Sequence, residues 1–132
     1  MSNENIKNTK TCKVVLVGES GVGKTCLISR FVSSEFEETT STTGATYSTK
    51  VIDLGNQSIK FEIWDTAGQE KYRSLTKIFY KNAAACLIVY DITSKVSFTE
   101  IKEYWYNSLK EHASQNISIY KYNYYFSSYI NW

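Results

Sequence analysis

The chain of 132 residues has no proline, one histidine and only three cysteines, and these scarcities exclude several kinds of site. The cysteines are odd in number and show neither CxxC nor Cys/His spacing, which gives no basis for a disulfide framework or a zinc site. We therefore expect Cys12, Cys26 and Cys86 to be reduced thiols that mostly pack against neighbouring residues.

Long apolar runs and concentrated charge are also lacking. No stretch approaches the roughly 20 apolar residues of a membrane span, and the first residues, MSNENIKNTK, contain no apolar segment typical of a signal peptide. The formal net charge is +2, and no segment gathers five or more lysines and arginines, so we expect no nucleic-acid partner. With 42% hydrophobic and 21% charged residues, the chain predicts one modest core and a cytoplasmic protein.

Alternating strands and helices are predicted up to about residue 119. Residues 13–17 form a short apolar run typical of a buried strand, and residues 24–31 carry apolar side chains at helical spacing. Residues 45–54 and 59–64 alternate in polarity around the turn residues LGNQS, which predicts a hairpin. The run AAACLIVY at 83–90 predicts another strand, buried on both faces. This order favours an α/β fold with a largely parallel sheet and helices on both faces.

One further helix is predicted near residue 100. Ser97 and Glu100 have the spacing of a capping box. The apolar face that follows consists of Phe98, Ile101, Trp105, Leu109 and His112.

The stretch GESGVGKT, residues 18–25, matches the phosphate-binding P-loop pattern GxxxxGK[ST] between a predicted strand and a predicted helix. Gly18, Gly21 and Gly23 allow backbone N–H groups to turn toward phosphates, and the start of the following helix adds its positive end. Lys24 is placed to reach the β- and γ-phosphate oxygens, and the Thr25 hydroxyl is a hard ligand suited to Mg²⁺.

A second motif, WDTAGQE at residues 64–70, begins where the strand 59–64 ends. In a doubly wound sheet ligands bind at the carboxyl edge, so Asp65 and Gly68 are expected beside the P-loop. Together with YRSL and VYDIT, the two motifs resemble those of Ras-like small GTPases and most of all the Rab subfamily, over roughly residues 10–119. The resemblance implies a P-loop three-layer α/β fold with a mostly parallel sheet, binding GTP or GDP and Mg²⁺.

The resemblance also implies roles for individual residues. Gln69 orients the attacking water as the catalytic residue, and Thr25, Thr42 and Asp65 hold the metal, Asp65 through water. The segment before Gly44 is one residue shorter than is usual in the family, so Thr43 is an alternative to Thr42. The positions assigned to nucleotide binding are Gly18, Glu19, Ser20, Gly21, Val22, Gly23, Lys24, Thr25, Cys26, Phe36, Asp65 and Gly68.

The last residues depart from the family pattern. The tail YKYNYYFSSYINW has seven aromatic residues among thirteen, where the family continues to an asparagine-lysine-x-aspartate motif that reads guanine. We expect a disordered tail at 1–10, a partial small-GTPase domain at 11–119 and a non-family tail at 120–132, with the C-terminal strands and helices missing. Such a chain is expected to bind guanine nucleotide weakly, without much preference over adenine, and to aggregate.

Two functions of different kinds remain open at this point. The first is a Rab-like GTPase switch in intracellular vesicle trafficking, which meets exchange factors, GTPase-activating proteins and effectors. The alternative is a truncated, non-enzymatic remnant that keeps only the phosphate-binding and effector-surface motifs. Family members associate with endomembranes, but the prenylated C-terminal cysteines are absent from this sequence, so we expect no membrane association.

Overall fold

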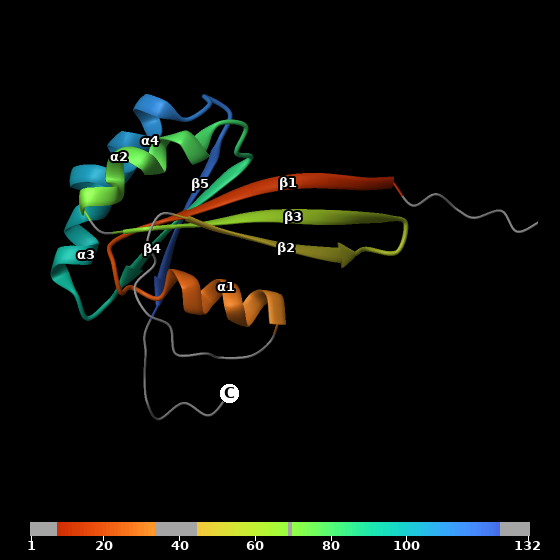
Figure 1. The fold of residues 1–132 in the computed structure, drawn as a ribbon, viewed down its shortest axis with the longest axis horizontal. Helices are drawn as coiled ribbons and strands as arrows, with labels where there is room; N and C mark the ends of the chain where they lie inside the picture. Colours follow the sequence, from red (N-terminus) through yellow and green to blue (C-terminus); the bar gives the residue numbers. More distant parts are fainter. Residues whose placement is uncertain (1–7, 34–44, 69, 125–132) are drawn as a thin grey trace, which may run out of the picture.

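In the computed structural model, which describes residues 8–33, 45–68 and 70–124, five strands form one sheet in the order β2-β3-β1-β4-β5 (Figure 1). The strands are β1 (Asn8–Val17), β2 (Ala45–Asp53), β3 (Gln57–Thr66), β4 (Ala85–Asp91) and β5 (Ser118–Tyr124). Strand β1 pairs in parallel with β3 and β4, and β4 pairs in parallel with β5. Strand β2 is antiparallel to β3. The expected mostly parallel α/β sheet is confirmed.

Helical segments cover both faces of this sheet (Figure 1). They are α1 (Lys24–Ser33), η1 (Glu70–Tyr72), α2 (Arg73–Thr76), η2 (Lys77–Tyr80), α3 (Lys95–Glu100), η3 (Ile101–Trp105) and α4 (Tyr106–His112). Segments η1 and η2 are 3₁₀ turns, whereas η3 is a π-helical turn that joins α3 directly to α4. Helix α1 lies on one face, and the segments from η2 to α4 supply the packing on the other.

Two hydrophobic cores result from the alternation of side chains along β1. Val15 and Val17 face a core completed by side chains of η2, β4, η3 and α4, whose members include Tyr80, Ile88, Trp105 and Leu109. Leu16 faces the opposite core, which contains Val22, Ile28, Ile63 and Val89. Strand β4 serves both cores, with Ile88 in the first and Val89 in the second. The central strands are thus fixed from both sides, and their carboxyl ends are held at one edge.

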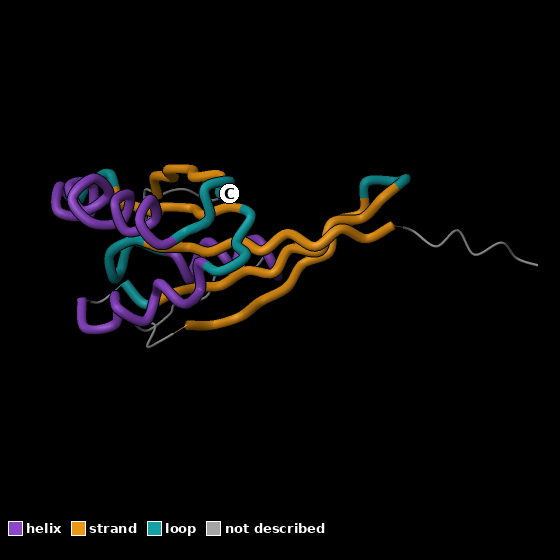
Figure 2. The backbone as a smooth tube through the Cα atoms, turned by 90° about the horizontal axis from the view of Figure 1, so that it is seen from above, coloured by secondary structure: helices purple, strands orange, loops and turns teal. Residues whose placement is uncertain are grey.

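The hairpin predicted for residues 45–64 is confirmed; its first strand ends one residue earlier than expected, at Asp53, and its second strand is longer, running from Gln57 to Thr66. Asp53 pairs with Ser58 at the closed end, and Gly55, with φ of 88°, turns the chain between them. The backbone N–H of Gly55 donates a hydrogen bond of 2.8 Å to the Asp53 carboxylate. The hairpin and the beginning of β1 project beyond the helices (Figures 1 and 2).

The strand bounds differ from the expected segment bounds at both ends of the domain. Strand β1 begins at Asn8 rather than residue 13, because its polar first half pairs with β3 from Gln57 onward. Residues 120–124, expected in a non-family tail, belong to β5, which pairs with β4 as far as Tyr124. In both places hydrogen bonds to a neighbouring strand define the element, and such bonds leave no apolar pattern in the sequence.

The capping box predicted at Ser97 and Glu100 is wrong. Helix α3 begins at Lys95, three residues earlier than a Ser97 cap would place it, and Ser94 is its N-cap, accepting a hydrogen bond of 3.2 Å from the Ser97 backbone N–H. The buried Ser97 Oγ instead lies 3.1 Å from the Asp91 carbonyl oxygen and 2.9 Å from the Ser94 carbonyl oxygen, so its one O–H can donate to either. Phe98, expected on the apolar face, is 60% exposed and lies against Tyr90 with 5.5 Å between ring centroids.

Candidate functional site

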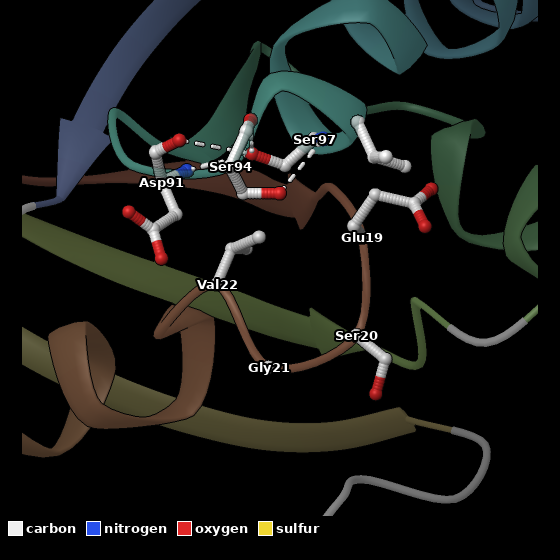
Figure 3. A pocket seen from close by; sticks show the side chains of 8 residues that line it. Glu19, Ser20, Gly21, Val22, Asp91, Ser94 and Ser97 are labelled. Atoms are coloured by element: carbon white, nitrogen blue, oxygen red, sulfur yellow. Dashed lines mark hydrogen bonds between the residues drawn. The ribbon is translucent and has the colours of Figure 1, made fainter.

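The loop at residues 18–23 connects the end of β1 to the start of α1 at the carboxyl edge of the sheet (Figure 3). Gly18, Gly21 and Gly23 have φ values of 145°, 78° and 99°. At Gly18 a Cβ atom would stand 2.2 Å from the Val89 carbonyl oxygen, so glycine is required there by close packing as well as by conformation. The Val22 side chain is buried in the core with Leu16, which anchors the loop from beneath.

Lys24 is the buried cation of this loop. Its ammonium donates hydrogen bonds to the carbonyl oxygens of Gly18, at 2.9 Å, and Glu19, at 2.7 Å. Burial lowers the pKa of Lys24 to about 8, while the charges of Asp65 and Glu19 act in the opposite direction. The ammonium is therefore mostly charged at neutral pH and is partly shielded from water, which strengthens its attraction for an anion.

Thr25 and Asp65 meet across the sheet edge, although forty positions separate them in the sequence. The Thr25 hydroxyl donates a hydrogen bond of 2.5 Å to the Asp65 carboxylate. The parallel register of β1 and β3, with Leu16 opposite Asp65, delivers the carboxylate to the base of the loop. Asp65 is buried, with 3% of its surface exposed.

Gly68 stands directly against the loop backbone. A Cβ atom at this position would lie 2.2 Å from the Gly18 carbonyl oxygen and 2.4 Å from the Glu19 carbonyl carbon and the Ser20 nitrogen. The segment that follows β3 therefore contacts the P-loop through bare backbone. Asp65 and Gly68 were expected beside this loop from the sequence, and the structure places both there.

A cavity of about 270 Å³ opens on the flank of the loop toward the β4–α3 turn (Figure 3). Its lining combines the loop residues Glu19, Ser20, Gly21 and Val22 with Asp91, Ser94, Val96 and Ser97. The motif VYDIT indicated only the family, and the sequence pattern did not identify Asp91, Ser94 or Ser97 as neighbours of the loop. The Asp91 carboxylate accepts hydrogen bonds from the Thr93 backbone, at 2.8 Å, and hydroxyl, at 2.7 Å, which fixes this turn.

Several expected site residues are not among these neighbours. Phe36, Thr42, its alternative Thr43, and Gln69 lie outside the described residues. Cys26 lies in the first turn of α1 and is partly exposed. Glu19 also forms an ion pair with Arg73 of α2, which the sequence did not predict.

The same residues determine which metal ion the site could hold. Within the described ranges, no three His, Cys, Asp or Glu side chains gather into a metal cage. One carboxylate beside one hydroxyl, as at Asp65 and Thr25, instead fits Mg²⁺, which is usually held by one or two protein oxygens together with substrate phosphates and water. In the described part of the chain no helix has the length and apolar character needed to cross a membrane.

Comparison with known proteins relates this sequence to one family. The Ras family model matches residues 13–121. The chain is 51% identical over 111 residues to a ras-related protein Rab-5B of Dictyostelium discoideum, covering 84% of this chain and 51% of that protein. It is 47% identical over 108 residues to the ras-related protein rab-11.1 of Caenorhabditis elegans, covering 81% and 51%. It is 50% identical over 108 residues to the GTP-binding protein ypt3 of Schizosaccharomyces pombe, covering 81% and 50%.

The chain spans about half the length of the curated relatives it matches. The matched region contains the described P-loop site, from residue 13 of β1 through Gly68. Since the family model covers most of the chain and these relatives are Rab-type proteins, the chain belongs to the Ras family, as a Rab-like small GTPase.

Proposed function

We propose that this chain binds GDP and GTP with Mg²⁺, hydrolyses GTP and acts as a switch in intracellular vesicle trafficking. The observation that carries the proposal is the convergence of Lys24, Thr25, Asp65 and Gly68 on a single glycine-rich loop. A site for a magnesium-bound polyphosphate needs these groups: a buried lysine, a hydroxyl, a carboxylate and backbone without a side chain.

Phosphate binding is assigned to the loop at residues 18–23 and the start of α1. Backbone N–H groups of the loop donate to phosphate oxygens, and the first turn of α1 contributes its partial positive charge. Lys24 uses two of its three N–H donors on the loop carbonyls, so the third can reach a β- or γ-phosphate oxygen while the loop keeps its shape.

Mg²⁺ is assigned to Thr25, with Asp65 behind it and Thr42 completing the set. When bound, the ion neutralises charge on the β- and γ-phosphates. The hydrogen bond between Thr25 and Asp65 aligns the hydroxyl oxygen and supplies negative charge at the point where a cation is needed.

Hydrolysis is assigned to Gln69, which orients the attacking water, with the Gly68 N–H directed at the γ-phosphate. Positioning and charge neutralisation account for most of the catalysis in such sites, so intrinsic turnover should be slow without an activating partner. Phe36 is proposed to pack against the base. Exchange factors, GTPase-activating proteins and effectors are proposed as partners, and the segments that contain Thr42 and Gln69 are proposed as their contact surfaces.

Nucleotide binding by the whole chain tests the site. Titration of fluorescent GDP with Mg²⁺ should show about a hundredfold weaker binding for Lys24→Ala and for Thr25→Asn, since each loses charge-assisted or metal-directed bonds. Lys102→Ala is the matched control, because Lys102 is exposed on η3 and the variant loses the same charge away from the loop. Equal affinity in the wild type and all three variants would refute the site.

Single-turnover hydrolysis separates the enzyme from the remaining candidate function, a chain that binds phosphate without turning it over. In a chain with measurable GTPase activity, Gln69→Leu should slow hydrolysis while GTP affinity stays nearly intact. Tight GTP binding without any hydrolysis, even with an activating protein added, would support the non-enzymatic candidate.

A further inference from the structure

Arg73, the first residue of α2, contacts four side chains that come from three other segments. Its guanidinium pairs with the carboxylate of Glu19 in the P-loop and, at 3.1 Å, with that of Glu100 at the end of α3. The guanidinium carbon also lies 4.4 Å from the ring centroid of Tyr104 and 5.2 Å from that of Trp105. Only 15% of the Arg73 side chain is exposed, so this cluster is largely shielded from solvent.

The π-helical turn η3 explains how two consecutive aromatic residues reach the same cation. In an α-helix neighbouring side chains diverge by about 100°. In η3 the Tyr106 N–H bonds to the Ile101 carbonyl, five residues back, which widens the turn. Tyr104 and Trp105 then stand edge to face, with 4.9 Å between their centroids, and both contact Arg73.

Glu19 presents an electrostatic problem for a loop that receives a polyanion. Its carbonyl oxygen accepts a hydrogen bond from the Lys24 ammonium, and its carboxylate charge acts on the pKa of that same lysine. A carboxylate this close to the phosphate-binding cation repels phosphate oxygens unless a cation neutralises it. Arg73 provides such a cation, in a fork-shaped geometry suited to carboxylates.

We propose that Arg73 is a positioning residue for nucleotide binding, which neutralises Glu19 inside the phosphate loop and holds α2 against that loop. The inference rests on the proposed function of the site. Arg73 itself does not touch the phosphates; it acts through Glu19, and the aromatic rings of η3 hold its guanidinium in place. The ligand whose affinity it raises is a nucleoside di- or triphosphate.

A double-mutant cycle on the full chain tests this, with fluorescent GDP and Mg²⁺ as the probe. Arg73→Gln alone should weaken GDP binding about tenfold, because an uncompensated carboxylate is left in the loop. Glu19→Gln alone should strengthen binding. Added to a chain that already carries Glu19→Gln, Arg73→Gln should change the affinity by less than about twofold.

Two further variants separate this role from a structural one. Lys77→Gln removes the same charge from the exposed side of η2 and should leave GDP affinity within about twofold of the wild type. Arg73→Lys keeps the charge but loses the forked guanidinium, so its GDP affinity should lie between those of the wild type and Arg73→Gln. If Arg73→Gln proves unfolded by circular dichroism, Arg73→Lys replaces it in the cycle, compared with and without Glu19→Gln.

The outcomes for this inference and for the proposed function are distinct. A wild-type chain that binds no GDP overturns the proposed function and this inference with it. Suppose instead that the wild-type chain binds GDP and that the Arg73 substitution lowers GDP affinity equally with and without Glu19→Gln. That result overturns only the inference and assigns Arg73 a purely structural role. The inference is also overturned if the Arg73 substitution leaves GDP affinity unchanged both with and without Glu19→Gln.

Discussion

Replacing Gly68 with alanine adds one methyl group where three backbone atoms of the P-loop already stand. The added carbon would lie 2.2 Å from the Gly18 oxygen and 2.4 Å from the Glu19 carbon and the Ser20 nitrogen. No flexible side chain is among these neighbours, so a change of rotamer cannot relieve the overlap. Non-bonded heavy atoms pack best at about 3.5–4.0 Å, so the two backbone segments must separate by about 1 Å or more.

The cost of this separation falls on both stability and binding. Overpacking a close contact costs about 1–3 kcal/mol, and contact with backbone on both sides places Gly68→Ala near the upper value. The Gly18 oxygen that the methyl group displaces also accepts the 2.9 Å hydrogen bond from Lys24. We therefore expect a loss of about 3 kcal/mol in the free energy of unfolding and GDP binding weakened at least about tenfold.

Urea unfolding and GDP titration measure the two effects, with Gly55→Ala as the control. Gly55 has φ of 88° in the hairpin turn, and a Cβ there meets nothing within 4 Å. Its substitution should cost about 1 kcal/mol through backbone strain and leave GDP affinity unchanged. If Gly68→Ala is as stable as Gly55→Ala and binds GDP like the wild type, the close contact between Gly68 and the P-loop does not exist in solution.

Three other perturbations test the fold around the site. Ser94→Ala removes the N-cap of α3 and should lower the free energy of unfolding by about 1 kcal/mol in urea; no measurable change would mean that another group caps the helix. Thr66→Val removes a buried hydroxyl that donates to the Leu16 carbonyl at 2.6 Å, and the same assay should show a loss of about 1–2 kcal/mol, with a fully stable variant contradicting the bond. Burial raises the pKa of Tyr80 above its ordinary value of 10.0, so above pH 10 the unfolded chain loses a proton that the folded chain keeps, and stability falls as pH rises. Tyr80→Phe should flatten this decline by up to about 1.4 kcal/mol per pH unit, and an unchanged slope would show that Tyr80 ionises as readily in the folded state.

The parts of the fold that the sequence predicted well are those whose signals are local. A glycine-rich loop between an apolar strand and an apolar helix can be recognised from a short stretch of sequence, and the alternating hairpin needs no distant partner. The position of Asp65 beside Thr25 followed from one general rule, that parallel strands end at a common edge. The Rab-like family assignment depended on the same short motifs, and the family comparison supports it.

The features that were missed depend on contacts between distant segments. Ser94 and Ser97 are three residues apart and both suit a cap, and the hydrogen bonds of Ser97 to Asp91 decide between them. The polar half of β1 is a strand only because β3 pairs with it. Arg73 and Glu19 are fifty-four positions apart, and no spacing pattern identifies them as partners.

Among the described residues, three of the contacts that hold the P-loop come from different elements, and this arrangement bears on how nucleotide binding would be transmitted. Lys24 binds the loop from within α1, Gly68 supports it from the end of β3, and Arg73 reaches it from α2. Gly68 and Arg73 are only five positions apart in the sequence, so a displacement of one would affect the other contact as well. If the site binds GTP as proposed, a γ-phosphate that draws the Gly68 N–H toward itself would alter the position of Arg73 relative to Glu19. The nucleotide affinity of the loop and the conformation of α2 would then be linked.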